Sequence, residues 1–183
     1  WVIINYLLST GHRIQTIIKL KVGDIDFEEG YINVNTQKNK GVNRIGLIRK
    51  MAVILKEYIT YYRCDEVGEP LYDEVLFCNR YGEPLTDGGL KMSIKSYNEK
   101  RGVSKTSIHL FRHTFAKNWI VSGGDIVSLQ KMLGHSSLKM VQRYANLYAS
   151  DVKEKAEDFA ILAQTRTKSG KTLQKRQPLK IRK

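Results

Sequence analysis

One short segment of alternating side chains constrains the fold most, because it stands in a chain otherwise dominated by helical spacing. Between residues 30 and 37, Ile32 and Val34 fall on one face and polar or aromatic side chains on the other, which is typical of a half-buried strand. Residues 44–49 alternate again after a polar turn that contains glycine. The two segments predict an antiparallel β-hairpin with Lys38 near its tip.

Helical spacing covers most of the remaining sequence. Helices are expected at residues 12–21, 50–63, from Thr86 or Asp87 to about Tyr97, and at residues 109–121, 126–133, 138–146 and 151–164. The helix at 50–63 is expected to turn inward Ile54, Leu55, Tyr58 and one of Tyr61 and Tyr62. Residues 1–8 predict the end of a buried helix, and residues 74–78 a short third strand. No internal repeat is apparent. The expected fold class is mainly α with a small antiparallel β-sheet (α+β).

Length and charge indicate one domain with a tail. A chain of 183 residues with 42% hydrophobic residues can bury a core, and we expect a domain at 1–164. Residues 165–183 carry eight Lys or Arg and no acid, so we expect a basic tail that is disordered alone. The net charge of +13 predicts a polyanionic partner, although charge alone does not separate DNA from RNA or an anionic membrane. The apolar start suggests a chain that begins inside a domain.

Several classes of site are not expected. No apolar run approaches the ~20 residues needed to cross a membrane. Cys64 and Cys78 lack metal-ligand spacing and are interpreted as buried thiols in a reducing cytoplasm. No carboxylate cluster, H-E-x-x-H motif or P-loop is present, so we predict no metal and no cofactor.

Six polar residues at particular spacings predict metal-free cutting of a phosphodiester. They are Arg13 in T-G-H-R, Lys38, His109 and Arg112 in H-L-F-R, His135 in L-G-H, and Tyr144 nine residues later. Guanidinium groups match the non-bridging oxygens of a phosphate in shape and charge. Imidazole and ammonium groups can move protons, and a phenol can attack phosphorus. Arg13 and Arg112 lie 99 residues apart, so only the fold can bring them together.

Some of these assignments have rivals in the sequence. Tyr148 competes with Tyr144 as the nucleophile, and Lys40 competes with Lys38 on the same turn. His12 and His113 are interpreted as ordinary core or surface residues.

In this order, the motifs are strongly specific, and from roughly residue 1 to 162 the chain resembles the catalytic domain of a tyrosine recombinase of the phage-integrase type. The resemblance implies that Tyr144 forms a 3′-phosphotyrosyl bond. It also implies that His109 and His135 donate to phosphate oxygens and accept the tyrosine's proton, with the base left open between them. Lys38 would protonate the leaving 5′ oxygen. The family often has an acid where this chain has Thr16, which leaves the support of Arg13 open.

The resemblance also implies partners and a role. Double-stranded DNA and a homo-tetramer on DNA are expected, with the helix at 151–164 docking on a neighbouring protomer or packing on its own domain. The family's N-terminal DNA-clamping domain is not in this sequence. We expect the integrase of a mobile element, bacterial or phage-encoded, cytoplasmic and nucleoid-associated. A chromosome-dimer resolvase, a type IB-like topoisomerase and a non-catalytic DNA-binding module are the alternatives.

Overall fold

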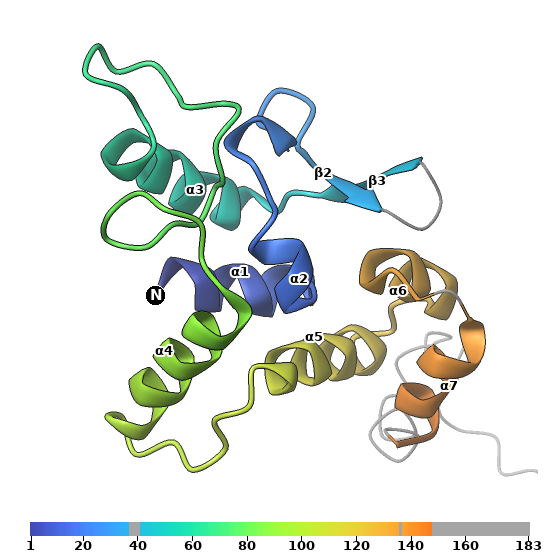
Figure 1. Cartoon of the computed structure of the whole chain (residues 1–183). Helices are drawn as coiled ribbons and strands as arrows, with labels where there is room; N and C mark the ends of the chain where they lie inside the picture. The colour runs from blue at the N-terminus through green and yellow to red at the C-terminus, as the bar shows by residue number, and fades with distance from the viewer. Residues whose placement is uncertain (37–40, 136, 148–183) are drawn as a thin grey trace, which may run out of the picture.

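The computed structural model describes residues 1–36, 41–135 and 137–147, and every structural statement below concerns this part of the chain. Its elements, in chain order, are α1 (Val2–Thr10), α2 (Ile14–Ile17), the 3₁₀ turn η1 (Val22–Asp24), β1 (Ile25–Asp26), β2 (Tyr31–Thr36), β3 (Gly41–Gly46), α3 (Arg49–Tyr62), α4 (Asp87–Glu99), α5 (His109–Val121), α6 (Ile126–Leu133) and α7 (Leu138–Leu147) (Figure 1). The helical fold with one small antiparallel sheet confirms the predicted class. The predicted helix at 151–164 and the basic tail lie outside the described residues.

The sheet has the order β1-β2-β3, and both of its strand pairs are antiparallel. Ile32 stands at the centre, opposite Ile25 on one side and Ile45 on the other, and it is fully buried. The predicted antiparallel pairing is confirmed, but its second strand is Gly41–Gly46 and not residues 44–49, and its tip lies outside the described residues. The third strand is β1 and not residues 74–78. That segment buries Leu76 and Phe77 consecutively, so no face of it alternates, and its two β-bridges, Val75 to Lys21 and Cys78 to Pro84, are isolated.

Two helix predictions need correction. The helix expected at 12–21 stops at Ile17, because the chain then extends so that the carbonyl of Leu20 accepts a bond from Leu76. In α3 the buried stripe is Met51, Leu55 and Ile59. Tyr61 and Tyr62, one of which was expected to point inward, are both exposed, because the buried stripe runs along a neighbouring face of the helix.

The helices that follow agree closely with the sequence. α5 and α6 begin and end at the predicted residues. The hydroxyl of Thr86 accepts the main-chain N–H of Gly89 at 3.0 Å and caps α4. The carboxylate of Asp125 accepts two N–H bonds at the start of α6. Side-chain caps therefore mark the starts of α4 and α6, whereas the first residue of α5 follows Ile108 without a side-chain cap.

The buried side chains form two clusters. The larger lies among α1, α3, α4 and the sheet, and the smaller among α5, α6 and α7. α1 packs against α5, which joins the two clusters. At this junction Gly11 ends α1 with a φ of 63°, and an added Cβ would lie 2.6 Å from Phe115. The close approach of α1 and α5 thus requires a glycine.

The chain contains a short internal repeat, which the sequence-based predictions do not include. The segments 64–71 and 78–85 share the pattern C-[DN]-x-x-G-E-P-L. In each, the side chain of Asp65 or Asn79 accepts N–H bonds from the residues two and four positions later, at 2.8 to 3.0 Å. The glycine of each segment has a positive φ, 91° and 81°. These paired turns connect α3 to α4. The two cysteines are free and only partly buried.

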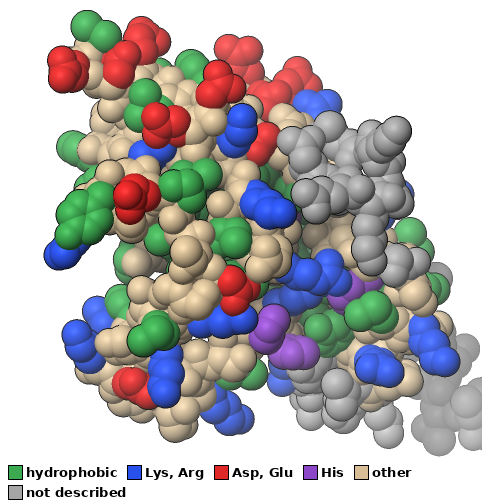
Figure 2. All heavy atoms as spheres, in the orientation of Figure 1, with side chains coloured by type: hydrophobic (Ala, Val, Ile, Leu, Met, Phe, Trp, Pro, Cys, Tyr) green, Lys and Arg blue, Asp and Glu red, His purple; other side chains and the backbone are tan. Residues whose placement is uncertain are grey.

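Charge is divided over the surface. Figure 2 shows most acidic side chains toward the top of the view, and Lys, Arg and His side chains over its centre and lower half.

Among the described residues, no helix is long and apolar enough to pass through a lipid bilayer.

Candidate active site

Arg112 is held at the junction of the two clusters by main-chain carbonyls. Its Nη1 donates to the carbonyl of Gly11 at 2.8 Å, and its Nη2 donates to the carbonyl of Leu133 at 2.7 Å. The side chain is 7% exposed and forms no ion pair within the described residues. Burial and the neighbouring Arg13 lower the pKa of Arg112 to about 10, while Tyr144 acts against this shift. The guanidinium therefore stays protonated near neutral pH.

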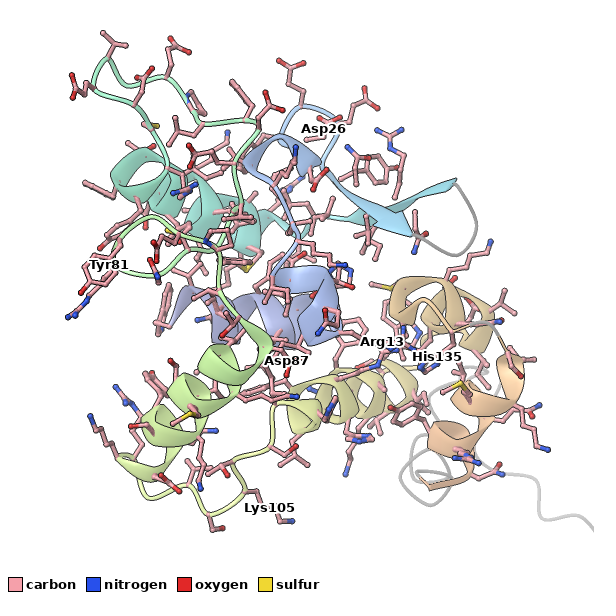
Figure 3. All side chains as sticks on the ribbon, in the orientation of Figure 1. Arg13, Asp26, Tyr81, Asp87, Lys105 and His135 are labelled. Atoms are coloured by element: carbon pink, nitrogen blue, oxygen red, sulfur yellow. The ribbon has the colours of Figure 1, made fainter. Side chains whose placement is uncertain are left out.

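Arg13 also reaches the carbonyl of Leu133, which accepts from Arg112. It precedes α2, it is exposed, and its Nη1 donates to the carbonyls of Leu133 and Gly134 at 3.3 and 3.1 Å. Figure 3 shows its side chain directed toward His135. The two arginines share the carbonyl of Leu133, so the fold brings together groups that lie far apart in sequence. Main-chain carbonyls orient Arg13, although Thr16 replaces the family's acid.

His135 follows the left-handed Gly134 that ends α6, and it is 9% exposed. Its Nε2 lies 2.7 Å from Nη2 of Arg112. Because a guanidinium only donates, Nε2 must accept, which places the ring proton on Nδ1. Nδ1 is buried and has no hydrogen-bond partner among the described residues. Burial, followed by Arg112 and Arg13, lowers the pKa of His135 to about 4, so the ring is neutral at pH 7.

Tyr144 lies in α7 with its ring beside His135. The two rings are nearly parallel, at 6° to one another, with centroids 6.4 Å apart. Tyr144 is 8% exposed, and its closeness to the Arg112 guanidinium partly offsets the lowering of the pKa of Arg112. Four of the six predicted site residues therefore meet: Arg13, Arg112, His135 and Tyr144.

His109 stands apart from these four. It is the first residue of α5, one helical turn before Arg112, and it is exposed. Its charge helps to hold the pKa of Asp87 below its ordinary range, after the larger effects of Lys91 and Gln15. Within the described residues His109 makes no hydrogen bond to the other four. It borders the site from the side of α4.

Lys38 and its rival Lys40 lie outside the described residues, and so does Tyr148. The hairpin that carries the two lysines is nevertheless tied to the site. The side chain of Asn43 in β3 donates to the carbonyl of Lys131 in α6 at 2.9 Å. Figure 1 shows the hairpin extending toward α6.

Two histidines that the sequence predicts to be ordinary core or surface residues both adjoin the site. His12 is 5% exposed, and its Nδ1 lies 2.8 Å from the hydroxyl of Tyr6. Burial, and then Arg112, lower the pKa of His12 to about 3. The ring of His113 contacts the ring of Tyr144. In the sequence, each of these histidines stands next to a site arginine, His12 before Arg13 and His113 after Arg112. This was the one signal that could have placed them near the site.

Two cations, a neutral imidazole and a phenol thus face one another at the junction. Such a set can hold an anionic tetrahedral group and present an oxygen nucleophile to it. In the part of the chain that the structure describes, no three His, Cys, Asp or Glu side chains gather to hold a metal ion. The metal-free mechanism stays a prediction.

Comparison with known proteins identifies this arrangement. Residues 2–151 match the sequence model of the phage integrase family. The tyrosine recombinase XerD of Staphylococcus haemolyticus is 30% identical over 158 residues, which are 86% of this chain and 53% of that protein. The chain spans about half the length of the curated relatives it matches.

Solved structures show the same likeness. The XerA recombinase superposes with a TM-score of 0.73 at 26% identity, over 86% of this chain and 55% of that one. The Tn1549 transposon integrase, in complex with circular intermediate DNA, superposes with a TM-score of 0.67 at 25% identity, over 87% of this chain and 59% of that one. The chain belongs to the phage integrase family of tyrosine recombinases.

Proposed function

We propose that residues 1–164 are the catalytic domain of a site-specific DNA recombinase that cuts one DNA strand with Tyr144 and joins it to a partner strand. The observation that carries the proposal is the pair Arg112 and Arg13, which meet beside Tyr144, and no carboxylate among the described residues pairs with the buried Arg112. A buried cation without an anionic partner favours binding of an anion from outside the protein.

The proposed reaction proceeds by exchange at one phosphorus atom. The Tyr144 oxygen attacks the phosphorus in line, the bond to the 5′ oxygen breaks, and a 3′-phosphotyrosyl ester forms. The phenolic proton passes to His135 or His109, and Lys38 or Lys40 protonates the leaving 5′ oxygen. A 5′-hydroxyl of the partner strand then attacks the ester, and the tyrosine leaves. Because the ester conserves the bond, no external energy source enters the balance.

The described contacts fit the arrival of a phosphate. The guanidinium of Arg112 now donates to two carbonyls and to His135. Charged phosphate oxygens accept stronger hydrogen bonds than neutral carbonyls, so part of this set can be exchanged for the scissile phosphate. Nε2 of His135, released from Arg112, would then face the phosphate or the tyrosine. A neutral imidazole suits acceptance of the phenolic proton.

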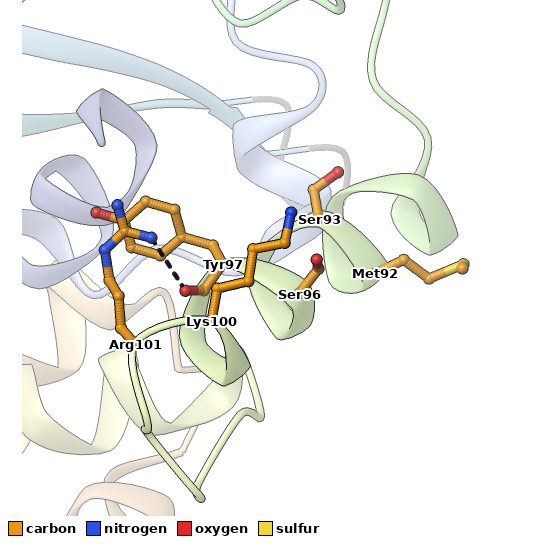
Figure 4. Close-up of a pocket in the computed structure, with 6 residues that line it drawn as sticks. All are labelled: Met92, Ser93, Ser96, Tyr97, Lys100 and Arg101. Atoms are coloured by element: carbon orange, nitrogen blue, oxygen red, sulfur yellow. Dashed lines mark hydrogen bonds between the residues drawn. The ribbon is translucent and has the colours of Figure 1, made fainter.

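A hollow on α4 offers contacts for the DNA backbone. It encloses about 580 Å³ and is lined by Met92, Ser93, Ser96, Tyr97, Lys100 and Arg101 (Figure 4). The guanidinium of Arg101 lies 3.5 Å from the centroid of the Tyr97 ring and donates to the Tyr97 carbonyl at 3.2 Å. Ser hydroxyls, an ammonium and a fixed guanidinium are groups that commonly bind DNA phosphates. We propose that this hollow adds affinity without reading sequence.

The larger assembly is also part of the proposal. We propose a homo-tetramer on two DNA duplexes, with residues 151–164 docking on a neighbouring protomer and the basic residues 165–183 lying along DNA. For the biological role we retain the integrase of a mobile element. The likeness to a transposon integrase supports it, while the likeness to XerD supports the resolvase alternative.

A suicide substrate tests the function. A nicked duplex is incubated with the chain, and a covalent protein–DNA band is sought on a denaturing gel. We expect the wild type and Tyr148→Phe to form the band in the presence of EDTA, and Tyr144→Phe to bind the duplex without forming it. No band from the wild type, or a band that requires Mg²⁺, would contradict the proposed mechanism. Relaxed circles without exchanged ends would indicate a topoisomerase instead.

A further inference from the structure

We propose that His113 is a positioning residue of this active site, which holds the ring of the nucleophile Tyr144 by an aromatic contact. The proposal rests on the function proposed above. The ring centroids of the two residues lie 5.5 Å apart, and their planes meet at 55°. This distance and tilt lie within the range of favourable aromatic pairs. The contact joins α5 to α7 directly at the proposed nucleophile.

The helix α5 serves the site with two different faces. Arg112 points inward and is buried, whereas the next residue, His113, is exposed. Successive side chains on a helix diverge by roughly 100°, so one helix delivers a guanidinium to the junction and an imidazole to α7. Below this contact, Val141 of α7 is fully buried in one cluster with Phe115 and Ala116 of α5. That packing fixes the spacing between the two helices.

Tyr144 has a second ring neighbour, but that neighbour is tied to Arg112. Nε2 of His135 accepts from Arg112, and the main-chain carbonyl of His135 accepts from Gln130. A phosphate that binds Arg112 would compete for the same guanidinium and disturb this contact. Within the described residues His113 makes no hydrogen bond, so its contact with Tyr144 does not depend on that exchange.

The contact bears on chemistry because it adds a restraint to a ring that otherwise stacks on His135 and packs in the smaller buried cluster. The hydroxyl of Tyr144 faces Arg112, and the direction of its ring decides whether the oxygen can lie in line with the scissile bond. A misplacement of about 1 Å in such a site can slow a reaction ~100-fold. We therefore assign to His113 the placement of the ring, an aromatic function that does not require its nitrogens.

The test compares substitutions at one position, using the full chain and the nicked duplex. We expect His113→Ala to slow formation of the covalent band by about ten- to a hundredfold. His113→Phe keeps a ring and should restore the rate to within about threefold of the wild type, whereas His113→Gln should not. Because His113 is exposed, duplex affinity and melting temperature should stay unchanged in all three. Asn118→Ala, an exposed change elsewhere on α5, is the matched control and should react like the wild type.

Two results would overturn the assignment. A His113→Ala chain that reacts as fast as the wild type would show that the contact is incidental. A His113→Phe chain as slow as His113→Ala, with unchanged affinity and melting temperature, would show that the nitrogens matter and that ring placement is the wrong role. If the wild type and Asn118→Ala form no covalent band, the proposed function itself fails, which distinguishes that failure from this one.

Discussion

Two arginines are buried in the described part of this molecule, and their surroundings differ in one decisive respect. Arg63, 2% exposed, lies where the paired turns meet α3, and its Nη2 forms an ion pair with Glu74 at 2.6 Å. Arg112, 7% exposed, lies at the junction of the two clusters and has carbonyls, an imidazole and a phenol around it instead of a carboxylate. Burying a charge is costly unless a partner offsets it.

On the proposed function, the difference separates an arginine that holds the structure from one that binds the DNA phosphate. At Arg63 the carboxylate of Glu74 supplies the counter-charge, and Nη1 of Arg63 also donates to the thiol of Cys78 at 3.5 Å. The Arg63 side chain therefore connects the end of α3 to the paired turns. At Arg112 no described residue supplies a counter-charge, and a second cation, Arg13, stands beside it. The missing anion is what a phosphodiester would supply.

The largest effect that should separate the two arginines is on cleavage. We expect Arg112→Lys to slow formation of the covalent band by ~100- to 1,000-fold, because an ammonium cannot form the two-pronged contact with phosphate oxygens. Arg13→Lys should act in the same direction. Arg63→Lys is the control and should leave the rate nearly unchanged, as measured by quenched time courses on the nicked duplex. Equal slowing by Arg63→Lys and Arg112→Lys would remove the distinction.

Acid should lower the stability of the fold through the two buried histidines beside Arg112, whereas the Arg63 site contains no histidine among its described residues. Burial holds the pKa of His12 at about 3 and that of His135 at about 4 in the folded chain. Unfolded histidine has a pKa of ~6.5, so between these values the unfolded state binds more protons, and the free energy of unfolding falls as pH falls.

The variant His12→Leu isolates this effect. It should lessen the loss of stability between about pH 6.5 and 3, which urea unfolding at several pH values would measure. Asn118→Ala, an exposed change that removes no titrating group, is the control and should leave the profile as in the wild type. An unchanged profile in His12→Leu would mean that folding does not lower the pKa of His12.

Stability should respond more to the loss of Arg63 than to the loss of Arg112. Arg63→Met removes the ion pair with Glu74 and the bond to Cys78, and we expect the free energy of unfolding to fall by ~1–3 kcal/mol. In Arg112→Met, the relief of an uncompensated buried charge opposes the loss of two bonds to carbonyls, so we expect a smaller fall. Urea unfolding of both variants measures this, and a larger fall in Arg112→Met would reverse the comparison.

The smallest predicted effect concerns inorganic phosphate. Phosphate at ten times its dissociation constant should stabilise the wild type by about 1.4 kcal/mol relative to chloride at the same ionic strength. The shift should persist in Arg63→Met and disappear in Arg112→Met, as followed by thermal melting. An equal shift in all three chains would mean that phosphate acts on the general surface and not at this junction.

The features of the fold that could be predicted from the sequence are those that depend on residues close together in the chain. The limits of α5 and α6 and the cap at Asp125 follow from residues close in sequence, so they were predicted correctly. The two-residue strand β1 and the early end of α2 depend on pairing with distant segments, and both were missed. The paired turns were visible as a repeat and were overlooked.

The site shows the same division. Motif spacing identified Arg13, Arg112, His135 and Tyr144, which the fold then brings together. The acceptor carbonyls of Gly11 and Leu133 could not be predicted, because every residue has a carbonyl and only the tertiary structure selects which ones meet an arginine. The ring contact of His113 is likewise tertiary, since α7 must return to α5 to create it.

The most direct test of the account is to identify the residue that becomes attached to DNA. The covalent adduct of the wild-type chain with the nicked duplex would be digested with nuclease and protease, and the modified peptide sequenced by mass spectrometry. The account predicts a 3′-linked nucleotide on Tyr144 and on no other tyrosine. A nucleotide on Tyr148, or on any side chain away from Arg112, would contradict it.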